Sequence, residues 1–128
     1  YEEGQWEVVI TGETSGSVST GVNGNYVKVG NMVTAAVYVN ATLDLTSISG
    51  VVNISLPLAA LNWHGGGSLV YANNFLAGTA ESDTYIGLRP LGARVRMMKG
   101  SSTSWLSPTD IETASGQKAF MMHVTFQV

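Results

Sequence analysis

The segment 23–39, NGNYVKVGNMVTAAVYV, limits what this chain can fold into more than any other stretch. It predicts two β-strands, Asn25–Val29 and Met32–Val39, joined by Gly30 and Asn31. A two-residue hairpin turn needs positive φ angles, which glycine adopts freely and asparagine tolerates. We therefore expect an antiparallel hairpin here.

A two-residue turn also fixes which side chains share a face of the hairpin. It pairs Val29 with Met32, Val27 with Thr34, and Tyr26 with Ala35. One face then carries Val27, Val29, Met32, Thr34, Ala36 and Tyr38, and the other carries Tyr26, Lys28, Val33, Ala35, Val37 and Val39. A solvent-facing antiparallel hairpin normally has one polar face, and this one has none. We expect a cover on both faces: loops of the same chain over a two-sheet sandwich, or a second copy of the chain.

The composition favours the second copy. Only 12% of the residues are charged, against the roughly 25% of an ordinary soluble domain, while 45% are hydrophobic. No apolar run approaches the ~20 residues that span a bilayer, so membrane insertion is not expected. The net charge is −3, and the six basic residues form no stripe, although Arg94 and Arg96 would share one face of a strand. This distribution argues against nucleic-acid binding.

Short alternating segments, many glycines and almost no helical pattern predict an all-β fold. We expect one domain, residues 1–128, built as an antiparallel β-sandwich of jelly-roll type with at most one short helical turn, at Ser107–Ala114. The expected strands besides the hairpin are Gln5–Thr11, Gly50–Leu58 (ended by Pro57), Ser68–Ala77 (bulged near Asn73 and Asn74), Tyr85–Leu88, Gly92–Met98 and Lys118–Val128, with Ser17–Ser19 as a further candidate.

Three short motifs resemble a known viral domain. Tyr1–Trp6 (YEEGQW) resembles the YEEGTW start of a C-terminal domain found in bacteriophage and prophage tail fibres and neck or tail appendages, and in related viral attachment proteins. Tyr26–Asn31 resembles its Y-x-K-I-G-N hairpin, and Asn53–Leu58 its strand ending in a Leu-Pro-Phe-like turn. Gln5 stands where threonine is usual and Leu58 where an aromatic residue is frequent. The motifs lie in the first half of the chain, and nothing in residues 62–117 adds to the resemblance.

The resemblance implies the C-terminal domain of a longer fibre or appendage protein, on the virion and outside the cell. It implies a β-sandwich that forms a homotrimer at the distal end and meets the host surface. It supplies no catalytic residue and no cofactor. The candidate trimer-interface residues are Trp6, Tyr26, Met32 and Tyr38.

Candidate ligand-binding residues gather around two tryptophans beside polar or glycine-rich segments. An aromatic ring can pack on the C–H face of a sugar while neighbouring polar groups bind its hydroxyls. The candidates are Trp63, His64, Tyr71, Asn73, Asn74, Asp83, Tyr85, Arg89 and Trp105. A tryptophan in a small β-domain is also a common core or interface residue, and that alternative stays open for each of them.

Enzymatic and metal sites have little support in the sequence. Glu2 and Glu3 are adjacent, so on a strand they point to opposite faces and form no carboxylate pair. His64 and His123 share no chelating spacing, there is no cysteine, and no G-x-S-x-G motif is present. Gly65–Gly67 lacks the context of a phosphate-binding loop and is expected to be a flexible loop.

These observations predict a non-catalytic, homotrimeric tip of a viral fibre or appendage that binds a host-surface receptor, most simply a glycan. The alternative is a structural trimerisation cap or capsid decoration domain without a host ligand. A sugar-modifying enzyme is the third candidate.

Overall fold

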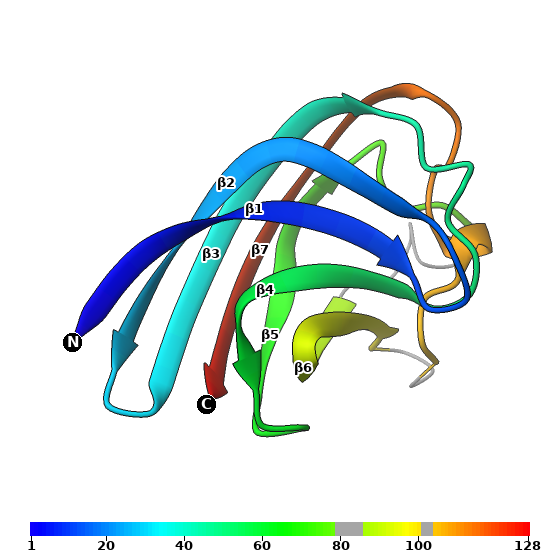
Figure 1. Ribbon diagram of the computed structural model, residues 1–128. Helices are drawn as coiled ribbons and strands as arrows, with labels where there is room; N and C mark the ends of the chain where they lie inside the picture. The colour runs from blue at the N-terminus through cyan, green and yellow to red at the C-terminus, as the bar shows by residue number, and fades with distance from the viewer. Residues whose placement is uncertain (79–85, 101–103) are drawn as a thin grey trace.

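The computed structural model describes residues 1–78, 86–100 and 104–128. In these residues it has seven strands and one short 3-10 helix (Figure 1). The elements are β1 (Glu2–Gly12), β2 (Ser17–Val29), β3 (Met32–Leu43), β4 (Val52–Ala60), β5 (Gly65–Asn73), β6 (Ile86–Lys99), η1 (Pro108–Asp110) and β7 (Gly116–Gln127). Among the described residues, no helix is long and apolar enough to cross a membrane.

The strands close into one antiparallel barrel in the order β1-β2-β3-β7-β5-β6-β4, and β4 returns to β1. The predicted all-β class is confirmed, but the two-sheet, jelly-roll-like sandwich is wrong. Closure depends on a short seam in which Ile10 pairs with Ile54 and Gly12 with Val52. The same inward-outward alternation serves a sandwich and a barrel, so the sequence pattern alone does not distinguish them.

The predicted hairpin register is confirmed in β2 and β3. Val29 pairs with Met32, Val27 with Thr34, and Tyr26 with Ala35. The face with Val33, Ala35, Val37 and Val39 lies inside the barrel, and the opposite face points outward with Val29 61%, Tyr38 47% and Met32 43% exposed. Loops of the same chain therefore do not cover the outer face in the part of the chain that the structure describes.

The barrel interior is filled by apolar side chains from every strand. Alternate residues of β7 point inward, and the four apolar ones are fully buried: Phe120, Met122, Val124 and Phe126. Residues from the connecting segments close one end of this core: Leu45, Ile48, Phe75, Leu106 and Ile111. The barrel is a packed core, as expected for a barrel this narrow.

Several strands extend past their predicted bounds. β6 runs unbroken through Arg89 and Pro90, where two strands were expected. β4 continues through Pro57, which lies where its pairing with β6 becomes irregular, so its missing N–H interrupts no regular ladder. The predicted helical turn is present as the 3-10 helix η1, and Ser107 and Asp110 form a capping box at its start.

The glycine run Gly65–Gly67 begins β5, so its interpretation as a flexible loop is wrong. A Cβ atom on Gly67 would lie 2.0 Å from the carbonyl oxygen of His123, because β5 and β7 pack closely there. The bulge in β5 is between Leu69 and Tyr71, not at Asn73 and Asn74. The bulge turns Tyr71 to the outside of the barrel, opposite Met121.

Two glycines of β1 and β2 face aromatic residues on the neighbouring strand. Gly4 pairs with Tyr26, and Gly24 pairs with Trp6. A Cβ atom on Gly24 would lie 2.4 Å from the Trp6 ring, and one on Gly4 would lie 2.8 Å from the Tyr26 ring. Glycines paired with aromatic side chains in this way are a known device for stabilising a sheet. The YEEGQW and hairpin motifs therefore have a direct structural role in holding β1 on β2.

We predict that Gly67→Ala strongly destabilises the barrel, by about 3 kcal/mol or more, because the methyl group meets backbone atoms that cannot move aside. Gly66→Ala is the matched control, since its nearest atom would be 3.7 Å away. Chemical denaturation of the two variants measures the difference. Equal stability of the two would contradict the close β5–β7 approach.

Candidate functional site

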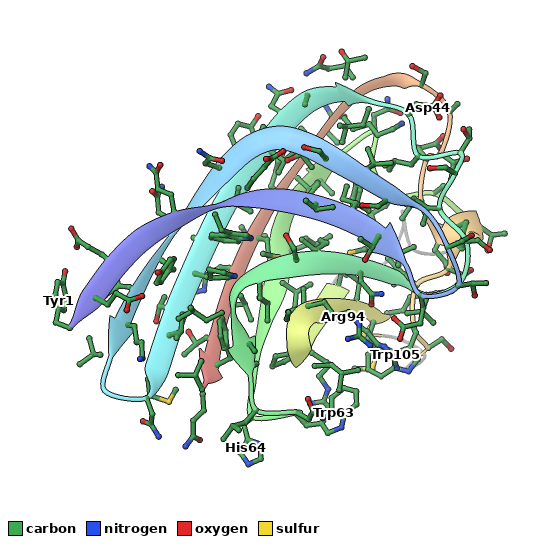
Figure 2. All side chains as sticks on the ribbon, in the orientation of Figure 1. Tyr1, Asp44, Trp63, His64, Arg94 and Trp105 are labelled. Carbon is green, nitrogen blue, oxygen red and sulfur yellow. The ribbon has the colours of Figure 1, made fainter. Side chains whose placement is uncertain are left out.

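Trp63 and Trp105 stack on each other, although 41 intervening residues separate them in the sequence. Their ring centroids are 5.9 Å apart, with an angle of 19° between the planes. Trp63 comes from the β4–β5 connection and Trp105 from the segment between β6 and η1 (Figure 2). Trp63 is 48% exposed and Trp105 is half-buried, so the pair presents an indole to solvent.

The backbone at Trp63 is in a conformation that side chains other than glycine rarely adopt, with φ of 67°. Hydrogen bonds of Trp63 and of the two residues before it hold it there. The Trp63 N–H donates to the Pro90 carbonyl at 3.0 Å, and the Leu61 N–H donates to the Gln127 carbonyl at 2.8 Å. The Asn62 Oδ1 accepts the Gly92 N–H at 3.0 Å. A left-handed tryptophan costs on the order of 1–2 kcal/mol, and such strain tends to occur at functional sites.

A charged cluster lies beside Trp105 on the outer face of β4 and β6. The Glu13 carboxylate accepts hydrogen bonds from Arg94 (2.8 and 3.3 Å), Arg96 (3.2 Å) and Asn53 (2.6 Å). The Arg96 guanidinium carbon is 5.5 Å from the centre of the Trp105 ring, which is within the range of a cation–π contact. We call Trp63, Trp105, Arg94, Arg96 and Glu13 the tryptophan site.

These contacts keep Glu13 ionised. Hydrogen bonds from Arg94 and then Asn53, with a lesser one from Arg96, lower the pKa of Glu13 from 4.5 to about 2, although burial opposes the shift. The carboxylate therefore holds both guanidinium groups in place throughout the neutral pH range.

The other predicted ligand residues are divided between two parts of the molecule. His64 follows Trp63 and is exposed, with its Nδ1 2.9 Å from the Asn62 carbonyl oxygen. Arg89 is exposed on β6, next to the Pro90 that binds Trp63. Tyr71, Asn73 and Asn74 lie at the far end of β5: Tyr71 packs 6.2 Å from Tyr38, and Asn74 donates to the Gln117 carbonyl. Asp83 and Tyr85 lie outside the described residues.

Sequence reasoning missed three members of the tryptophan site, Arg94, Arg96 and Glu13, and the supporting residue Asn53. Arg94 and Arg96 alternate along a strand and were expected to share a face, which was the available signal. Glu13 had no such signal, because it is brought to β6 only by the β1–β4 seam. Asn53 is 1% exposed and serves the cluster through its side-chain amide.

The strands β2, β3, β7 and β5 form a second surface, which we call the neutral wall: the outward-facing side chains of these four strands. All their residues are described, and their only Asp, Glu, Lys or Arg side chains are Lys28 and Lys118. Lys118 is buried, and Lys28 pairs with the inward-facing Val33. The wall instead carries exposed apolar residues: Val27, Val29, Met32, Tyr38, Tyr71 and Met121.

The predicted interface residues divide between the two sides of the strands. Met32 and Tyr38 lie on the neutral wall, where Tyr38 lines a hollow of about 290 Å³ with Asn23, Asn25 and Met121. Trp6 and Tyr26 are half-buried on the other side of β1 and β2. There Trp6 donates its indole N–H to the Ser55 carbonyl, and the Tyr26 hydroxyl donates to Glu2.

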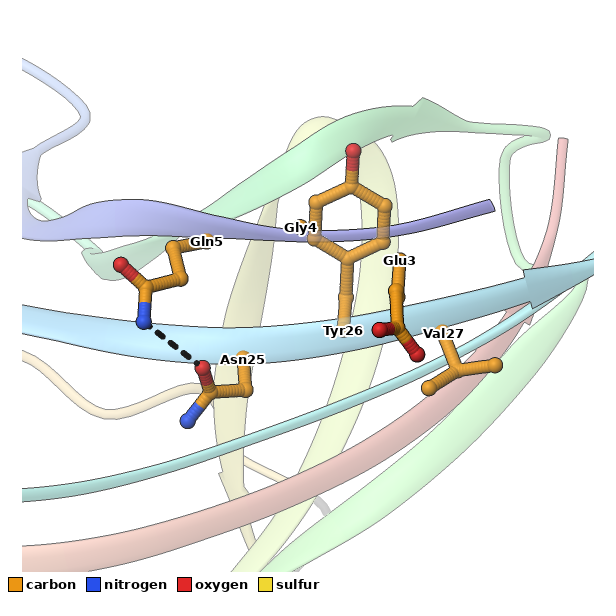
Figure 3. A pocket seen from close by; sticks show the side chains of 6 residues that line it. All are labelled: Glu3, Gly4, Gln5, Asn25, Tyr26 and Val27. Carbon is orange, nitrogen blue, oxygen red and sulfur yellow. Dashed lines mark hydrogen bonds between the residues drawn. The ribbon is translucent and has the colours of Figure 1, made fainter.

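A further hollow of about 380 Å³ lies over β1 and β2 (Figure 3). It is lined by Glu3, Gly4, Gln5, Asn25, Tyr26 and Val27. Gln5 donates to Asn25 across it at 3.2 Å. Its side chains thus bind one another between the paired strands, and no cluster of catalytic groups lines it.

In the described part of the chain, no three histidine or acidic side chains gather where they could hold a metal ion. Comparisons with family models, with curated proteins and with solved structures found no match for this chain.

We predict that Glu13 stabilises the fold only above its own pKa. Its folded-state pKa is about 2, below the ordinary 4.5, so its contribution is complete above pH 4.5 and is lost as the pH falls toward 2. Glu13→Gln should therefore unfold at a lower temperature than the wild type at pH 6, by an amount worth roughly 1 kcal/mol or less for a partly exposed pair. Melting curves at pH 6, 4 and 2 should converge at the acid end. A difference that stays constant would contradict the assignment.

Proposed function

We propose that this chain is the non-catalytic, homotrimeric tip domain of a viral fibre or appendage, which binds a host-surface glycan through the tryptophan site. The observation that carries the glycan-binding part is the stack of Trp63 on Trp105. The stack leaves a flat apolar ring in solvent, with arginine side chains beside it.

The chemistry of the tryptophan site suits a sugar. One face of a pyranose ring is formed by C–H groups, and a tryptophan offers a rigid surface of matching size at low entropic cost. Specific binding also needs a few fixed polar groups around the apolar surface. Arg94 and Arg96 are fixed by Glu13, and Asn62 is fixed by Gly92.

The neutral wall supports self-association. An interface core is depleted of charged residues and enriched in tyrosine and methionine, and the wall has both properties. A charged side chain near a symmetry axis would be repelled by the same side chain of the other copies. The outward positions of the neutral wall carry no such charge. Three copies would hold three weak sugar sites on one rigid axis, which raises avidity without a tight single site.

The viral context rests on the YEEGQW, YVKVGN and NISLPL motifs, which resemble those of fibre and appendage tips. On this proposal, the domain lies on the virion, outside the cell, and belongs to a longer fibre or appendage protein. The neutral wall by itself would equally serve a trimerisation cap or capsid decoration domain, which is the second candidate.

We predict that Trp63→Gly abolishes binding on a glycan array while the domain stays as stable as the wild type. Glycine relieves the strained backbone at this position, which offsets the lost ring contact of roughly 1 kcal/mol. Trp105→Ala should also lose binding. Tyr1→Ala is the control. It removes an aromatic side chain that is 86% exposed and lies far from Trp63 and Trp105 (Figure 2), so this variant should bind normally. Full binding by Trp63→Gly would refute the site, and absence of glycan binding by the wild type would favour the cap.

We predict a mass of about three times 13.5 kDa by light scattering. Ala36→Asp introduces a charge in the neutral wall and should reduce the mass to that of one chain. Ala93→Asp makes the same change at an exposed position of β6, outside the wall, and should leave the trimer intact. A wild-type monomer, or equal behaviour of both variants, would rule out the wall as the interface.

A further inference from the structure

We infer that the tryptophan site takes an anionic saccharide, with the sugar ring on Trp63 and a carboxylate or sulfate group of the sugar at Arg94 and Arg96. This inference deepens the proposed glycan-binding function and rests on it. The argument depends on charge, on unused hydrogen-bond donors and on spacing.

The cluster has a surplus of positive charge. Among the described residues it contains two guanidinium groups and one carboxylate, that of Glu13. Both oxygens of Glu13 are already occupied, since Oε1 accepts from both arginines and Oε2 accepts from Arg94 and Asn53. Glu13 therefore positions the guanidinium groups without neutralising the pair.

The arginines also have hydrogen-bond donors to spare. A guanidinium group has five N–H donors in a planar fork that fits a carboxylate or sulfate. Among the described residues, Arg96 uses one of them, an Nη2 N–H, on Glu13. The Arg94 side chain is 36% exposed and the Arg96 side chain 20%, so an anion from solvent can reach the pair.

The spacing fits one short saccharide. Trp105 lies between the two parts of the site: its ring is 5.9 Å from that of Trp63 and 5.5 Å from the guanidinium carbon of Arg96. The Trp63 ring centre and the Arg96 guanidinium carbon are therefore at most about 11 Å apart, a span that a short oligosaccharide covers. A neutral sugar would leave the positive charge beside the indoles without a counter-ion, whereas an acidic sugar supplies one.

Three tetrasaccharides with the same linkage test this inference: tetragalacturonate, its carboxyl-reduced galactose counterpart, and that counterpart carrying sulfate groups. Titration calorimetry at low salt should show tetragalacturonate or the sulfated form binding at least about tenfold more tightly than the neutral one. The preference for one anion over the other distinguishes carboxylate from sulfate recognition. The preference should weaken with added salt, because the arginines are partly exposed.

Variants separate the two contacts. Arg94→Gln should weaken binding of the anionic sugars much more than binding of the neutral one, while Arg94→Lys, which keeps the charge, should retain part of the preference. Trp63→Gly should weaken binding of all three sugars. Thermal unfolding of each variant confirms that it is folded.

The outcomes separate this inference from the function on which it rests. Equal, Trp63-dependent binding of the neutral and anionic sugars would overturn anion selectivity and leave glycan binding intact. Anionic binding that Arg94→Gln does not weaken would also overturn it, and so would a failure of all three sugars to bind. If the wild type also binds no glycan on the array, the proposed glycan-binding function is contradicted as well.

Discussion

The whole architecture depends on β7, which is hydrogen-bonded along both edges. It pairs with β3 from Gly116 to Gln127 on one side and with β5 on the other. The close approach of Gly67 to the backbone of His123 allows the second pairing. Because β7 joins the β1-β2-β3 strands to the β5-β6-β4 strands, the short β1–β4 seam can close the barrel and leave the apolar half of each strand inside (Figure 1).

Closure gives the outside of the barrel two different surfaces. On β2, β3, β7 and β5 the outward positions carry no Asp, Glu, Lys or Arg, so this wall suits contact with identical copies. The β1–β4 seam brings Glu13 to Arg94 and Arg96 on β6, and the stacked tryptophans lie beside them. The proposed self-association and the proposed ligand binding would therefore use separate surfaces.

Local patterns predicted local structure well and long-range closure poorly. The Gly30-Asn31 turn and the alternation in β3 were enough to predict the hairpin register and the inward face, because both depend on neighbouring residues. Barrel closure depends instead on the pairing of Ile10 with Ile54, for which a single sequence has no signal. The same limit applies to the site: Trp63 and Trp105 were each recognised as candidates, but their stacking, and the arrival of Glu13, follow from the closed topology.

The proposed division of the surface, with the neutral wall covered by other copies and the tryptophan site free, is tested most directly by hydroxyl-radical footprinting of the protein in solution. In a single chain Met32, Met121 and Trp63 are exposed to similar extents, at 43%, 39% and 48%. Accessible methionine oxidises readily and buried methionine does not. We expect strong oxidation of Trp63 with Met32 and Met121 protected to the level of the buried Met97 and Met122. Oxidation of Met32 and Met121 in proportion to their exposure in one chain would contradict the division.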